Sequence, residues 1–240
     1  MTRLSPAARH RERMLGKLAA SAGQPGGVTT GSAYELMLVQ LHEDRLKLSR
    51  IQSVERKIEV KATMLPAYQA WIDGVLSAGK GAQDEVLVNA MVWHIDVGDY
   101  ERALQIAGYA VAHQFTLPDR YNRTLPTLLQ DDIAGASLGG KLKDEPERAA
   151  DLLQQVLAMT GNADTPDQAR AKVHKALGLA LMELVNKIDA ESITAASADF
   201  ATAALQNLIR AGELHQAAGV KKEIERLERR LKKFAEPTAK

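Results

Sequence analysis

The sequence predicts an all-α protein in which a long helical hairpin is followed by a tetratricopeptide-like body of antiparallel helices. Aromatic residues make up only 4% of the 240 residues, whereas strands are enriched in aromatic and β-branched side chains. Apolar residues recur at spacings of three, four and seven, which is typical of amphipathic helices. Within segments 98–111 and 198–211, an aromatic residue is followed by small and large apolar residues, as in tetratricopeptide helices. Their period is irregular, so we expect packed helical hairpins and not a regular repeat array.

The two ends of the chain are basic, although the net charge is only +1. Residues 1–20 carry five basic side chains against one acid, and residues 219–240 carry eight against four. Such ends suggest contact with an anion such as nucleic acid, while the acidic middle has another role. The chain has no cysteine, which excludes disulfides and thiolate metal sites. We find no secretory signal and no apolar run that would span a membrane, and we expect a cytoplasmic protein.

Residues 1–20 are expected to form a basic helical arm that begins at Ser5-Pro6. The segment 21–31 is rich in Gly, Pro, Ser and Thr, which predicts a flexible linker and an arm that is tethered and not packed. Basic side chains at four-residue intervals share one face of this helix and can follow a phosphate backbone. The candidate nucleic-acid contacts are Arg3, Arg9, Arg11, Arg13 and Lys17. The alternative is a solvated amphipathic terminus.

Residues 32–115 are expected to form the long hairpin and a helical core that mediates oligomerisation. No Gly or Pro lies between Ala33 and Leu65, so we expect one continuous helix, with Pro66 opening the return helix. A long helix with a narrow apolar stripe usually pairs with another helix, in the same subunit or a neighbouring one. The candidate oligomerisation residues on this stripe are Leu41, Leu48, Ile51, Val54 and Ile58.

The rest of the chain reads as shorter helices separated by turns. Residues 79–83 form a turn, Asp84 caps the following helix, and Gly98-Asp99 ends it. Helical periodicity predicts the remaining helices at 99–115, 126–138, 147–159, 165–187, 197–217 and 220–234. Residues 116–240 thus form a helical body that ends in a basic amphipathic helix. This last helix could pack on its predecessor, bind a partner helix or present an anion-binding surface.

No catalytic, metal-binding or cofactor-binding constellation is recognised. The tripeptide Gly79-Lys80-Gly81 lacks the spacing of a phosphate-binding loop and no strand precedes it. Carboxylates recur at Asp84-Glu85, Asp131-Asp132, Asp144-Glu145 and Glu147, and most of these pairs fall at predicted helix starts or in exposed turns, where acids favour the helix dipole. A two-metal nuclease would need carboxylates that converge from rigid elements. The six histidines show no metal-ligand spacing.

Four segments carry a resemblance to a known family. They are YELMLVQL at 34–41, the run from LPAYQAW to QIAGYAV at 65–111, TPDQARAKVHKALG at 165–178 and AGVKKEIERLERRLK at 218–232. In this order they resemble the GpM-type small terminase subunit of tailed phages. The stretch GKGAQD, with the Trp and GD that follow it, is the most diagnostic part.

The resemblance implies a role in packaging phage DNA inside the host bacterial cytoplasm. A small terminase subunit binds the cohesive-end packaging site of concatemeric double-stranded DNA, assembles as a homo-oligomer that is often a ring, and recruits or regulates the large subunit. The large subunit carries the ATPase and nuclease. Two alternatives stay open: a metal-dependent endonuclease that directs cohesive-end cleavage, and a helical scaffold with no DNA role.

Overall fold

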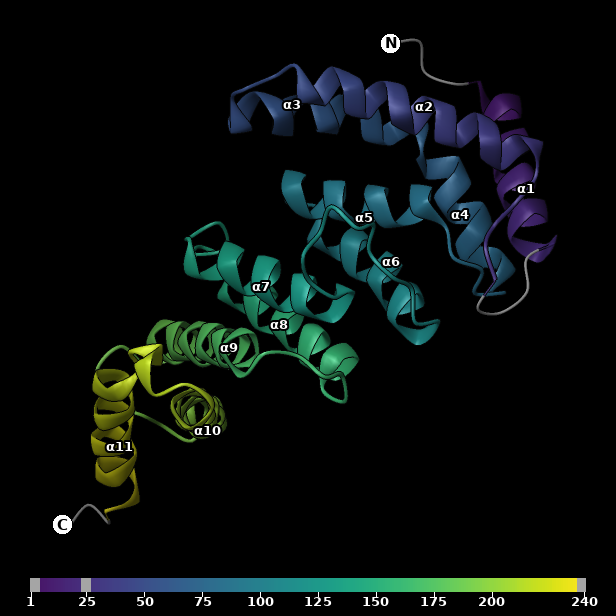
Figure 1. Ribbon diagram of the computed structural model, residues 1–240. Coiled ribbons are helices and arrows are strands. Elements are labelled where there is room, and N and C mark those ends of the chain that lie inside the picture. Colours follow the sequence, from purple (N-terminus) through teal and green to yellow (C-terminus); the bar gives the residue numbers. More distant parts are fainter. Residues whose placement is uncertain (1–4, 23–26, 237–240) are drawn as a thin grey trace. The chain divides into compact units, whose positions relative to one another are not determined.

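The computed structural model describes residues 5–22 and 27–236, which form helices and connecting loops (Figure 1). The chain divides into two compact units, with the division between Leu125 and Pro126. The helices before the division are α1 (Pro6–Ala22), α2 (Ser32–Ser49), α3 (Val54–Met64), the 3-10 turn η1 (Leu65–Ala67), α4 (Gln69–Ala78), α5 (Glu85–Val97) and α6 (Tyr100–Ala112). From Leu125 onward lie α7 (Leu125–Leu138), α8 (Pro146–Thr160), α9 (Asp167–Ile188), α10 (Ala198–Leu214), η2 (Gln216–Ala218) and α11 (Lys221–Ala235). The predicted all-α fold is confirmed.

Helix α5 forms the centre of the first unit. It is buried over most of its length, and α2, α3 and α6 pack against it. The carboxylate of Asp84 caps α5 by accepting a hydrogen bond of 2.9 Å from the backbone N–H of Leu87. Gly98 ends α5 in the left-handed conformation, with a φ of 83°, which a glycine adopts without steric cost. The predicted helix that starts at Asp84 and ends at Gly98 is therefore confirmed.

The prediction of one continuous helix from Ala33 to Leu65 is wrong, because α2 ends at Ser49. Ser53 starts α3 as its N-cap, since its hydroxyl accepts a hydrogen bond of 3.2 Å from the backbone N–H of Arg56. α3 then runs back antiparallel to α2 (Figure 1), and both helices contact α5. An unbroken helix over this segment would be about 50 Å long, far longer than the 13-residue α5. The hairpin thus lies within the segment that we expected to be its first arm.

Helix α9 is the central element of the second unit, with α8 and α10 packed against it. Gly178 of α9 allows close contact with α10, because a Cβ there would lie 2.7 Å from Cγ of Leu208. Gln130 of α7 donates a buried hydrogen bond of 2.9 Å to the hydroxyl of Thr160 in α8. The predicted helices in this unit agree with α7, α8, α9 and α11 to within two residues at each end. The helix predicted at 197–217 ends earlier, at Leu214, before the turn η2.

No helix within the described ranges combines the length and the apolar character that crossing a lipid bilayer requires.

Candidate nucleic-acid interface

Helix α1 carries the predicted basic face, and it packs along α4. Two glycines make the close crossing possible. A Cβ on Gly16 would lie 2.9 Å from the carbonyl oxygen of Trp71, and one on Gly74 would lie 2.3 Å from the carbonyl oxygen of Arg13. Both distances are shorter than any tolerated contact, so only glycine fits at these positions. The expectation that this helix is tethered and not packed is therefore wrong.

Small residues, and not large apolar ones, form the buried side of α1. Ala19 and Ala20 are buried with Gly16, whereas Met14 is 41% exposed and Leu18 is 62% exposed. Part of the predicted flexible linker is also fixed, since the backbone N–H of Thr29 donates to the carbonyl oxygen of Gln83 over 2.9 Å. Residues 23–26 of that predicted linker lie outside the described residues. The orientation of α1 is thus set by backbone-to-backbone proximity to α4.

Docking of α1 leaves its predicted basic face accessible. Arg9, Arg13 and Lys17 are all exposed. Arg9 and Arg13 line a shallow groove of about 420 Å³ together with residues from the start of α4, including Asp73. The carboxylate of Asp73 is ion-paired with Arg102 of α6. The groove therefore presents two arginines beside an acid whose charge is already balanced within the subunit.

The remaining two candidate contacts of the arm do not join this face. Arg11 is exposed on another side of α1, where it lines a second groove between α1 and α2. Arg3 lies outside the described residues. The groove that contains Arg11 has a volume of about 670 Å³ and is lined mainly by apolar residues, among them Leu15, Leu36 and Met37. The structure thus groups Arg9 and Arg13 with Lys17 and separates Arg11 from them.

The candidate oligomerisation residues occupy different environments. Leu41 and Leu48 are 1% and 7% exposed and belong to the subunit's own core. Ile51 and Ile58 are half-buried, and Val54 is 72% exposed. The stripe that contains Leu41 and Leu48 is therefore covered within the subunit, which removes the reason for assigning these two residues to a contact between subunits.

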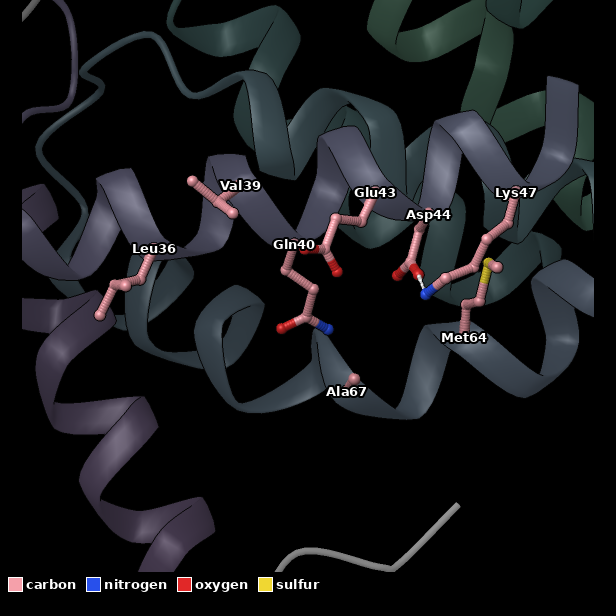
Figure 2. Close-up of a pocket in the computed structure, with 8 residues that line it drawn as sticks. All are labelled: Leu36, Val39, Gln40, Glu43, Asp44, Lys47, Met64 and Ala67. Atoms are coloured by element: carbon pink, nitrogen blue, oxygen red, sulfur yellow. Dashed lines mark hydrogen bonds and ion pairs between the residues drawn. The ribbon is translucent and has the colours of Figure 1, made fainter.

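The opposite face of α2 carries apolar side chains that sequence reasoning missed. Leu36 is 70% exposed, Val39 is 58% exposed and Leu46 is 46% exposed. The adjoining groove has a volume of about 370 Å³ and lies between α2 and the residues that end α3 and η1. Figure 2 shows side chains of α2 that point toward Met64 and Ala67 across it. The signal was present in the sequence, because α2 has apolar residues on two faces and only one can be turned toward α5.

The loop at 79–84, the most diagnostic stretch of the sequence, is a packing junction. The backbone N–H of Gly81 donates to the hydroxyl of Tyr109 over 2.7 Å. Gly81 has a φ of 72°, and a Cβ there would lie 2.2 Å from Nδ1 of His113. Gln83 exchanges two hydrogen bonds, of 2.9 and 3.0 Å, with the backbone of Thr116. The loop thus ties α4, α6 and the segment after α6 together, and its glycines serve the turn, as expected.

The carboxylates singled out in the sequence do not converge. Asp84 is fully buried and accepts hydrogen bonds from the indole Nε1 of Trp71 and the backbone N–H of Leu87, each 2.9 Å long. Burial raises the pKa of Asp84 to about 6. Asp131 belongs to the second unit, where its Oδ1 lies 3.7 Å from Nζ of Lys172 in the same unit. Across the part of the chain that the structure describes, no group of three His, Asp or Glu side chains is placed to hold a metal ion.

Comparison with known proteins connects this architecture to phage DNA packaging. The sequence model of the family described as phage small terminase subunit matches residues 38–168. The chain is 39% identical to the terminase, endonuclease subunit of Escherichia phage P2, over 98% of this chain and 89% of that protein. It is 27% identical to the probable terminase, endonuclease subunit of Haemophilus phage HP1, over 92% of this chain and 79% of that protein. No solved structure matches the chain. The family match over more than half of the chain and the near-full-length similarity together show that this protein belongs to the phage small terminase subunit family.

Proposed function

We propose that this protein is the DNA-recognition and adaptor subunit of a terminase, and that it contacts duplex DNA through the basic face of α1. The observation that carries the proposal is the accessible set Arg9, Arg13 and Lys17 on a helix that is firmly docked on α4. None of the three makes an ion pair within the described residues. Their positive charge is therefore available to phosphates, whose neutralisation releases bound counterions.

The wider role follows from the family. We propose that the subunit binds the cohesive-end packaging site of concatemeric phage DNA in the host bacterial cytoplasm and recruits or regulates the large terminase subunit. Phosphate contacts by α1 would position the protein on DNA and would not select a sequence. Recognition of one packaging site then requires further contacts, supplied by other copies of the subunit or by the large subunit.

We also propose that the protein assembles with copies of itself, as a ring or another homo-oligomer, through the outer face of α2. Leu36 and Val39 are more than half exposed on this face, and Leu36 lines both neighbouring grooves. Exposed aliphatic side chains that border shallow grooves favour contact with another protein surface. An assembly that displays several α1 helices would also multiply weak phosphate contacts.

A salt titration of duplex affinity tests the DNA-binding proposal. The variant with Arg9, Arg13 and Lys17 all changed to Gln should bind duplexes of any sequence more weakly, and its salt dependence should flatten by about one unit of slope for each lost contact. A charge-matched comparison sets Arg13→Gln with Lys17→Gln against Arg50→Gln with Lys80→Gln, since all four side chains are exposed. Equal affinity and slope in the two double variants would contradict the assignment to α1.

The names of the two relatives support one alternative, a metal-dependent endonuclease that cuts the packaging site. Incubation of the purified protein with Mg²⁺ and supercoiled DNA that contains the site separates this alternative from the adaptor role. An adaptor leaves the DNA intact until the large subunit is added. Nicking by the isolated protein that is lost in Asp131→Ala would instead assign the cleavage to this chain.

A further inference from the structure

The last helix, α11, is amphipathic, and its apolar side is covered within the subunit. α11 packs on α10, with Val220 and Leu227 buried and Ile224 and Leu231 half-buried. The apolar stripe of α11 therefore makes an internal contact, and no partner helix is needed to cover it. The other side of α11 is therefore the one that faces outward.

Four basic residues form a straight ridge on that outward side: Lys222, Arg226, Arg229 and Lys233. They are spaced by four, three and four positions, which places them within about 60° of one another around a helix of 3.6 residues per turn. All four are exposed, and none has an ion-pair partner among residues 27–236. With a rise of 1.5 Å per residue, the ridge is about 16 Å long.

The neighbouring Arg230 fixes the orientation of this ridge. Its guanidinium donates to Oδ1 of Asn186 over 2.8 Å and to the carbonyl oxygen of Asp189 over 2.9 Å, at the end of α9. A cation is favoured at the C-terminal end of a helix, where carbonyl groups lack partners. Arg230 is half-buried by this contact, so α11 is held both by its apolar side and by a charged anchor beside it.

The chemistry of the ridge fits a regular polyanion. A protein partner is normally held by buried aromatic or aliphatic anchors, and the ridge consists of Lys and Arg alone. Single-stranded nucleic acid is bound mainly by stacking of bases on aromatic rings, and the ridge has none. A duplex presents about ten phosphate charges over a length of about 16 Å, which a row of four cations can follow without base contacts.

We infer that the ridge of α11 is a second phosphate-binding surface for duplex DNA, carried by the unit that does not contain α1. The inference rests on the proposed function only in taking duplex DNA as the ligand of the whole chain. The inference assigns a second site, in the unit that contains α11, so that one subunit would contact DNA through both α1 and α11. The contact is independent of DNA sequence.

Fluorescence anisotropy with a labelled duplex of arbitrary sequence tests this inference on the full chain. Changing all four ridge residues to Gln should lower affinity, by up to about eightfold per contact at 0.1 M salt, and should reduce the salt slope by about 0.9 for each contact. The variant Lys222→Gln with Lys233→Gln should bind more weakly than its control, Lys141→Gln with Lys143→Gln. Both pairs remove two exposed lysines from the same unit, and thermal unfolding should be unchanged in both.

Three outcomes would overturn the inference, and they are separable from failure of the α1 proposal. If the α1 triple variant loses affinity and the four-residue variant does not, the ridge is not a DNA site while the proposed function stands. If the two lysine pairs weaken binding equally, the effect is one of net charge and not of the ridge. If poly-glutamate of matched charge displaces the duplex from the α1 triple variant, whose remaining DNA contact is the ridge, as well as unlabelled duplex does, the ridge binds an acidic protein segment instead.

Discussion

The indole Nε1–H of Trp71 donates a hydrogen bond of 2.9 Å to the carboxylate of Asp84, which is completely buried. The same carboxylate caps α5, so one acidic group joins α4 to the core helix. The ring of Trp71 also stacks on Tyr34 of α2 with a centroid distance of 5.8 Å. The hydroxyl of Tyr34 accepts a hydrogen bond of 2.9 Å from the backbone N–H of Glu85. Three helices of the first unit therefore meet at this buried carboxylate.

The stability of the protein should depend on pH through Asp84. Burial raises its pKa from 3.8 to about 6, although hydrogen bonds from Leu87, Trp71 and Val86 act in the opposite direction. Protonation is therefore easier in the folded protein than in the unfolded chain. The stabilisation from this group is complete below pH 4 and is lost as pH rises through about 6. The change in the free energy of unfolding is about 3 kcal/mol.

Asp84→Asn isolates this contribution, because Asn does not titrate. The difference in unfolding free energy between wild type and Asp84→Asn should shift in favour of wild type by about 3 kcal/mol as pH falls from 7 to 4. Urea unfolding at several pH values measures it. Asp164→Asn, at an exposed position, serves as the control and should run parallel to wild type. A difference between wild type and Asp84→Asn that stays constant with pH would contradict the prediction.

Gly74→Ala should dislodge α1. The added methyl group would meet the carbonyl oxygen of Arg13 at 2.3 Å and the backbone nitrogen of Lys17 at 2.7 Å, and backbone atoms cannot move aside as a flexible side chain can. Trypsin should then cleave α1 much faster than in wild type, because detached helices open locally.

Gly212→Ala in α10 is the matched control for this experiment. A Cβ at position 212 would lie 3.6 Å from Cγ2 of Val220, an ordinary contact. Alanine is favoured over glycine within a helix by about 1 kcal/mol, so this variant should be as stable as wild type or more so. Slow cleavage of α1 in Gly74→Ala would show that the close crossing of α1 and α4 is not needed for docking.

Leu48→Asp and Leu36→Asp should separate folding from assembly. Leu48 is 7% exposed and Leu36 is 70% exposed on the same helix. A charge at the buried position should cost about 3–5 kcal/mol and unfold much of the first unit. A charge at position 36 should leave the helical signal and the melting temperature near those of wild type. Light scattering should show a smaller native mass for Leu36→Asp, and an unchanged mass would place the subunit contact elsewhere.

Local sequence signals predicted most of the helices, since turns such as Gly98-Asp99 carry their own chemistry. The break near Arg50 was missed because it has no Gly or Pro. Its only local signal is Ser53, whose capping role depends on α3 turning back toward α5. The docking of α1 was missed for a related reason. Gly16 and Gly74 lie 58 residues apart, and only the folded chain shows that one backbone passes over the other.

The candidate sites show the same limit. The basic spacing of Arg9, Arg13 and Lys17 is a property of one helix and could be predicted from the sequence. Which side of α2 faces the core could not, because both sides carry leucines: Leu41 turned inward and Leu36 turned outward. That choice depends on how α2 packs against α5, which no pattern within α2 records.

Arg229 and Arg230 are adjacent on α11 but should respond oppositely to substitution. Arg230 is held by Asn186 and by the carbonyl oxygen of Asp189, whereas Arg229 is exposed on the outward ridge. Arg230→Gln should lower the free energy of unfolding by about 1–3 kcal/mol, because two half-buried acceptors lose a charged donor. It should leave the salt slope of DNA binding close to that of wild type.

Arg229→Gln should do the reverse. Its unfolding free energy should stay within about 0.5 kcal/mol of wild type, as for other exposed substitutions, while the salt slope should fall by about one unit. The two variants differ from wild type by the same charge and lie on the same helix, so net charge cannot explain a difference between them. Urea unfolding and duplex titration on both proteins measure the two quantities. If both variants flatten the salt slope equally, the distinction between a structural anchor and a DNA-binding ridge on α11 is wrong.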